Sequence, residues 1–127
     1  FNCGHGNHSI PAEGKKVCIG TASWPRDRLV GLLADTRVGE VRLTQSLSAT
    51  DIHINADASR GSLVIELSKN GEPIEGFNES NCVPMKEDSL DHTIRWRNSP
   101  NLPHIQPGEI DISVKLTNSE IFSIWSE

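Results

Sequence analysis

The chain has 127 residues, a length that fits one domain with a single hydrophobic core. Its 12 basic and 17 acidic residues give a formal net charge of -5. We therefore expect neither nucleic acid nor a membrane as a partner, because nucleic-acid phosphates and anionic lipid surfaces bind a basic surface. No apolar run approaches the roughly 20 residues that cross a bilayer, and the first residues lack a signal-peptide pattern.

Residues 1–16 are rich in Gly, His and Asn, lack apolar periodicity, and predict an N-terminal arm before a domain at residues 17–127. From there on, short runs alternate apolar and polar residues, which is typical of antiparallel strands with one face in water. The predicted strands are residues 17–22, 29–34, 40–46, 51–58, 62–68, 92–97, 109–117 and 121–126. Many short strands separated by turn residues predict an all-β fold, an antiparallel β-sandwich of jelly-roll-like form.

The same pattern predicts a tight turn, a surface excursion and the faces of the final strand. Asn70-Gly71 is the clearest tight turn, because both residues tolerate a positive φ. Residues 75–88 hold few alternating apolar residues and predict a long surface excursion. In the final strand, strict alternation places Phe122 and Ile124 on one face and Ile121 and Trp125 on the other, with Trp125 buried.

The three cysteines, Cys3, Cys18 and Cys82, cannot all pair within one chain. A Cys3–Cys18 disulfide would pin the N-terminal arm and would suit an oxidising compartment. Free, buried thiols are the alternative. Cys3, His5 and His8 are potential zinc ligands, but their spacing matches no standard zinc finger, so we interpret this segment as a loop.

Several short sequence motifs occur together in the domain. Residues 19–35 read IGTASWPRDRLVGLLAD, residues 54–58 read INADA, and residues 70–77 read NGEPIEGF; Asn81-Cys82, Arg95-Trp96-Arg97 and IFSIW at residues 121–125 follow. Together they resemble the C-terminal β-sandwich of bacterial glycoside-hydrolase-like proteins, which lies beside a catalytic propeller of the fructosidase or sialidase type. The resemblance implies an ancillary, carbohydrate-binding-module-like domain, a neighbouring catalytic domain as partner, and an extracellular or periplasmic location.

The loop of residues 24–28 is the first candidate binding site. Trp24 would stack on the apolar face of a sugar ring, and Arg26 and Arg28 would bind hydroxyls, carboxylates or sulfates, which favours an anionic polysaccharide. In the alternative interpretation, Arg26 and Asp27 form an internal ion pair that holds the loop, while Trp24 caps the edge of the core.

Two further aromatic residues are weaker candidates for ligand binding. Trp96 shares a strand face with Ile94, which indicates the core. Phe77 follows Gly76 in the predicted excursion and is either a plug over one end of the sandwich or a binding aromatic.

No spacing singles out the pair of carboxylates that a glycosidase needs, so we assign no catalytic residue. We predict no cofactor; a structural calcium ion held by turn carbonyls and an aspartate is an open alternative without a sequence motif. The favoured function is a non-catalytic carbohydrate-binding or ancillary module of an extracellular polysaccharide-degrading enzyme. The alternatives are a purely structural domain packed on a catalytic neighbour, and a small glycoside hydrolase or polysaccharide lyase.

Overall fold

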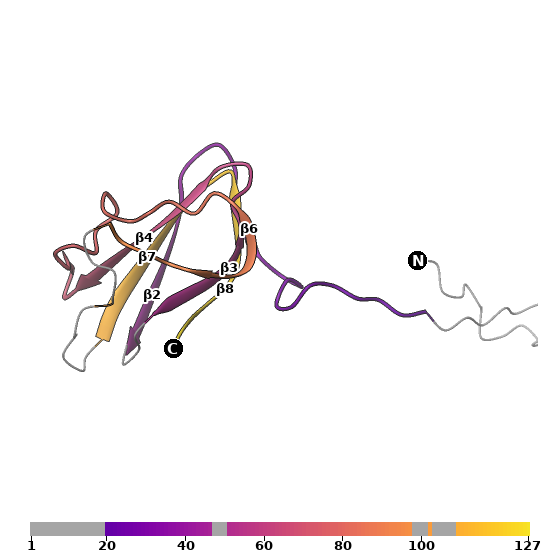
Figure 1. The fold of residues 1–127 in the computed structure, drawn as a ribbon, viewed down its shortest axis with the longest axis horizontal. Helices are drawn as coiled ribbons and strands as arrows, with labels where there is room; N and C mark the ends of the chain where they lie inside the picture. The colour runs from indigo at the N-terminus through magenta and orange to yellow at the C-terminus, as the bar shows by residue number, and fades with distance from the viewer. Residues whose placement is uncertain (1–19, 47–50, 98–101, 103–108) are drawn as a thin grey trace, which may run out of the picture.

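The computed structural model describes residues 20–46, 51–97, 102 and 109–127. Within these residues, eight strands form two antiparallel sheets that pack face to face, which confirms the predicted β-sandwich (Figure 1). The strands are β1 (Leu32–Ala34), β2 (Gly39–Ser46), β3 (Ile52–Asp57), β4 (Ser62–Lys69), β5 (Glu72–Pro73), β6 (Asp88–Thr93), β7 (Glu109–Thr117) and β8 (Ser119–Ser126). No helix of the described residues is long and apolar enough to span a membrane.

The order of the strands is that of a jelly roll. Sheet A runs β1-β8-β3-β6, and sheet B runs β2-β7-β4-β5. Strands 1 and 8, 2 and 7, 3 and 6, and 4 and 5 are therefore neighbours, as if one long hairpin had been wrapped into two sheets. The expected jelly-roll-like arrangement is thus present.

The core lies between the two sheets and follows the predicted alternation. Every second residue of β4 and of β7 is buried, and β3 and β8 contribute from the opposite sheet. The buried residues of these four strands include Leu63, Ile65, Leu67, Ile110, Ile112, Val114, Leu116, Ile52, Ile54, Ala56 and Ile121. The residues between them in β4 and β7 are mostly polar and face outward.

The predicted turn at Asn70-Gly71 is present, and a second tight connection lies at Asn118. Asn70 and Gly71 have φ angles of 54° and 83° and join β4 to β5 in a two-residue hairpin turn. Asn118, with φ at 45°, is the single residue that carries the chain from β7 in sheet B to β8 in sheet A. Both positions require the left-handed backbone that Asn and Gly adopt at low cost.

The predicted facing of β8 is wrong because a β-bulge interrupts the alternation. Asn55 pairs with Ser123 and Ala56 pairs with Ile121, so Phe122 is an extra residue on β8. Ile121 consequently turns into the core, and the Phe122 ring instead lies 4.7 Å from the guanidinium carbon of Arg28. Trp125 is only partly buried and stacks on His53, with ring centroids 5.5 Å apart.

The start of the chain also differs from the prediction. Residues 20–22 and 29–31 are not in strands, and residues 17–19 lie outside the described part of the chain. Only Leu32–Ala34 of the second predicted strand pairs with a neighbour. The first described residues extend away from the two sheets (Figure 1). The alternation of apolar and polar residues therefore predicted strands at residues 20–22 and 29–31 that the structure does not have.

The secondary structure and the burial of residues 75–97 differ from the prediction. The strand lies at Asp88–Thr93 rather than at residues 92–97, and Trp96 makes only an isolated bridge with Cys82. The segment predicted as a surface excursion buries Phe77, Cys82 and Met85. Its apolar residues are irregularly spaced, so a period of two could not identify them, yet they cover part of the core.

The Cys82 thiol is free and buried. Burial raises its pKa, which keeps the thiol protonated at neutral pH, and its sulfur accepts a hydrogen bond from the Ile65 N–H at 3.3 Å. Cys3 and Cys18 lie outside the described residues, as do His5 and His8, so the Cys3–Cys18 disulfide stays a prediction.

Candidate functional site

The loop of residues 24–28 contains both exposed and buried members of the predicted site. Trp24 is 55% exposed, and Arg26 and Asp27 form an exposed ion pair at 3.2 Å. Asp27 has a φ of 58°, a left-handed conformation that aspartate tolerates in turns. The ion pair considered in the alternative interpretation is therefore present, and Trp24 projects into solvent instead of capping the core.

Arg28 is anchored to sheet A and does not face solvent. Its side chain is 12% exposed and makes an ion pair of 2.5 Å with Asp88. Its Nε donates to Asn55 Oδ1 at 2.8 Å, and one Nη donates to the carbonyl oxygens of Ser89 and Ala56 at 3.0 and 3.3 Å. Asn55 in turn donates to the Arg26 carbonyl at 2.9 Å. These contacts fasten the loop to β3 and β6.

Phe77 and Trp96 lie together in the core, each 4% exposed. Their rings are 5.1 Å apart and tilted by 59°, a favourable geometry for an aromatic pair. The Trp96 indole donates to the Ile65 carbonyl at 3.2 Å. Of the five residues proposed from sequence, Trp24 and Arg26 are exposed, Arg28 is bonded to sheet A, and Phe77 and Trp96 form a separate buried pair.

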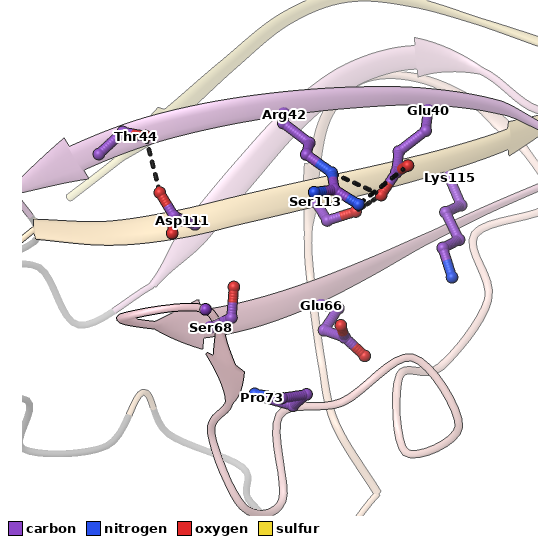
Figure 2. A pocket seen from close by; sticks show the side chains of 10 residues that line it. Glu40, Arg42, Thr44, Glu66, Ser68, Pro73, Asp111, Ser113 and Lys115 are labelled. Atoms are coloured by element: carbon purple, nitrogen blue, oxygen red, sulfur yellow. Dashed lines mark hydrogen bonds and ion pairs between the residues drawn. The ribbon is translucent and has the colours of Figure 1, made fainter.

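A different surface has the shape of a binding site. On the outer face of sheet B, a groove of about 350 Å³ runs over β2, β7 and β4, with the β4–β5 hairpin on one side (Figure 2). We call it the sheet B groove. Its lining residues are Glu40, Arg42, Thr44, Glu66, Ser68, Gly71, Pro73, Asp111, Ser113 and Lys115.

The register of sheet B arranges these side chains in rows across three strands. Glu40 lies opposite Lys115, which lies opposite Val64; Arg42, Ser113 and Glu66 form the next row; Thr44, Asp111 and Ser68 form the third. With strands about 4.8 Å apart and a rise of about 3.4 Å per residue, the rows cover roughly 10 by 14 Å. No two like charges lie directly opposite each other.

Hydrogen bonds hold most of the groove side chains in place. The Arg42 guanidinium donates twice to the Glu40 carboxylate, at 3.0 and 3.3 Å, and Ser113 donates to Glu40 at 2.6 Å. Thr44 donates to Asp111 at 2.7 Å (Figure 2). Such fixed side chains on a rigid sheet favour recognition, since little conformational freedom is lost when a ligand binds.

The loop after β5 is bonded to two of the groove residues through Glu79. The Glu79 N–H donates to Glu66 at 3.1 Å, and the Lys115 ammonium donates to the Glu79 carboxylate. The loop and the sheet are thereby tied together beside the groove. The β4–β5 hairpin contributes Gly71 and Pro73 to the lining of the sheet B groove, and the segment that follows is bonded to two further lining residues.

The pKa values of three groove residues are shifted toward the charged forms. The pKa of Glu40 is lowered, chiefly by the Ser113 hydroxyl and then by Arg42. The pKa of Arg42 is raised by its bond to Glu40, and the pKa of Lys115 is raised by its bond to Glu79. Glu40, Arg42 and Lys115 therefore stay ionised through the neutral range.

Within the described residues, no group of three or more His, Cys, Asp or Glu side chains is arranged to hold a metal ion. The structural calcium ion considered from the sequence would be held by turn carbonyls and one aspartate, a different ligand set, so it stays a prediction.

The sheet B groove was not identified from the sequence, although polar residues alternate with buried apolar residues along β7. The outward positions of β7, Asp111, Ser113 and Lys115, are polar, as expected for a solvated face. What turns this face into a groove is the pairing with β2 and β4, which are remote in sequence from β7. No family model, no curated protein and no solved structure matches this chain.

Proposed function

We propose that this jelly-roll domain is a non-catalytic carbohydrate-binding module and that its ligand binds in the sheet B groove. The observation that carries the proposal is the array of hydrogen-bonded donors and acceptors across β2, β7 and β4. Sugar hydroxyls both donate and accept hydrogen bonds, and Arg, Asp, Glu and Ser side chains supply the complementary partners. The guanidinium of Arg42 retains N–H groups beyond the two that bind Glu40.

The motif resemblance supports the same proposal, since it implies an ancillary domain of an extracellular polysaccharide-degrading enzyme. A module that binds polysaccharide raises the effective concentration of substrate at a neighbouring catalytic domain. The proposed partners are thus a polysaccharide and that neighbouring domain.

The test is affinity electrophoresis of this chain in gels that contain neutral, uronate or sulfated polysaccharides. We expect retardation by at least one polymer without release of product. Arg42→Ala and Asp111→Ala should each weaken binding about tenfold, the loss expected for a hydrogen bond that involves a charged group. Both side chains are on the sheet surface, so the melting temperature should stay near that of the unchanged protein.

Arg37→Ala is the matched control, because Arg37 is 91% exposed and pairs with Asp35 away from the groove. It should leave retardation unchanged. Absence of retardation with every polymer would refute the proposal, and release of product would select the hydrolase or lyase alternative. If Trp24→Ala abolished binding while Arg42→Ala did not, the loop of residues 24–28 would be the binding surface.

A second candidate function is a structural domain that packs on a catalytic neighbour, and the apolar residues before β2 favour it. Six large apolar side chains, each 55 to 76% exposed, lie within 15 residues of sequence: Trp24, Leu29, Val30, Leu32, Leu33 and Val38. Exposed apolar side chains that gather on one surface are typical of an interaction site, and the closeness of these six in sequence favours that arrangement.

We predict that a Val30→Ser, Leu33→Ser double variant will reduce the fluorescence of a bound hydrophobic dye at least twofold, with little change in melting temperature. Both side chains are at least 75% exposed, so they contribute apolar surface to solvent and little to the core. Leu90→Ser, at an exposed site on β6, is the control and should change the signal far less. Equal signals from all variants would show that these residues form no apolar surface.

A further inference from the structure

We infer that the sheet B groove selects neutral, hydroxyl-rich glycans and rejects uronate and sulfated chains. This inference rests on the proposed carbohydrate-binding function and specifies the substrate class of the same site. It departs from the anionic preference expected from the sequence, which depended on Arg26 and Arg28. Arg28 is committed to Asp88 and to sheet A, and neither arginine lines the groove.

The first argument is the balance of charge. The groove is lined by three carboxylates, those of Glu40, Glu66 and Asp111, against the two cations of Arg42 and Lys115. The Glu79 carboxylate beside Lys115 adds a further negative charge at the edge. An anionic chain placed over this surface would meet like charge, which disfavours it relative to a neutral chain.

The second argument is that both cations already have carboxylate partners. The forked donors of Arg42 bind both oxygens of Glu40, the geometry with which arginine would otherwise bind a sulfate or carboxylate. Lys115 is paired with Glu79. The positive charge of both side chains is therefore already offset by protein carboxylates, which weakens their attraction for an anion, whereas a neutral hydroxyl needs only the N–H groups that remain.

The third argument is the direction of the hydroxyl groups. Carboxylates only accept hydrogen bonds, so the Ser113 hydroxyl must donate to Glu40 and the Thr44 hydroxyl must donate to Asp111. Both hydroxyls then offer only lone pairs to a ligand, as do Glu66 and Asp111. A sugar hydroxyl can donate to these acceptors, but a sulfate or carboxylate oxygen has no proton to donate.

The test compares each neutral polysaccharide that retards the chain with its own chemically sulfated derivative, by affinity electrophoresis near neutral pH. We expect the neutral polymer to bind at least tenfold more tightly than the derivative. We also expect less than about a twofold change in binding of the neutral polymer between about 0.05 and 0.5 M salt, since no net charge is neutralised.

Glu66→Lys adds a cation inside the groove and should raise affinity for the sulfated derivative at least tenfold relative to the unchanged protein. Glu75→Lys makes the same change of charge at an exposed residue outside the groove lining and should have a far smaller effect. A normal melting temperature will show that Glu66→Lys is folded.

The outcomes separate this inference from the function on which it rests. Tighter binding of the sulfated derivative by the unchanged protein would overturn the selectivity while leaving carbohydrate binding intact. Equal gains from Glu66→Lys and Glu75→Lys would show that overall charge, not the groove, governs the choice. Failure of every polymer, neutral or sulfated, to retard the chain would overturn carbohydrate binding itself.

Discussion

Arg28→Met should lower the free energy of unfolding by about 3 kcal/mol, although the residue stands in a polar loop of the sequence. The substitution keeps much of the apolar stem but removes every N–H. It leaves Asn55 Oδ1 without its Nε donor, and it leaves the Ser89 carbonyl and the Asp88 carboxylate without their Nη donor. Each buried acceptor left unpaired costs about 1–3 kcal/mol, and the half-exposed Asp88 contributes less because water screens it.

Urea unfolding measures this loss, and Arg26→Met is the matched control. The Arg26 side chain is 83% exposed and forms an exposed ion pair with Asp27, so its removal should change stability by less than about 0.5 kcal/mol. Arg28→Lys should fall between the two, because one ammonium cannot reproduce the geometry of the guanidinium. A stable Arg28→Met variant that failed to bind glycan would instead return Arg28 to the binding role expected from the sequence.

The contrast between Arg26 and Arg28 shows what the sequence can and cannot predict about this loop. Arg26 and Arg28 are separated by one residue and stand in the same polar stretch of sequence. From the chemistry of the guanidinium group alone, both are expected to face a ligand. The partners that distinguish them are 27 and 61 residues away in sequence, at Asn55 and Ser89. Burial of Arg28 also depends on the bulge that turns Phe122 toward it. Neither feature is a pattern within one segment.

More of the fold than of the candidate site could be predicted from the sequence, because strands and tight turns depend on residues that are close together in the chain. Alternation identified β2, β3, β4, β7 and β8 closely, and the turn at Asn70-Gly71 follows from the backbone preferences of two residues. Alternation failed where the backbone departs from regular pairing, at the bulge and at residues 75–88. The sheet B groove could not be predicted either, since its rows require the register between strands that are distant in sequence.

Trp96→Ala should be the most destabilising of the aromatic substitutions, lowering the free energy of unfolding by about 4 kcal/mol. The indole is almost completely buried, packs on Phe77 and donates to the Ile65 carbonyl. Its removal leaves a large cavity and an unpaired buried carbonyl. Denaturant unfolding measures the change, followed by the fluorescence of the remaining tryptophans.

Two variants divide this effect into its causes and test the alternative role of Trp96 in binding. Trp96→Phe keeps an aromatic ring against Phe77 but loses the bond to Ile65, so it should recover roughly half of the stability lost in Trp96→Ala. Trp24→Ala removes an equal ring from an exposed site and should cost less than about 0.5 kcal/mol. If Trp96→Ala were as stable as Trp24→Ala, the indole could not be part of the core. Because burial decides whether an aromatic side chain is free to stack on a sugar, the same comparison decides which tryptophan remains a candidate for ligand contact.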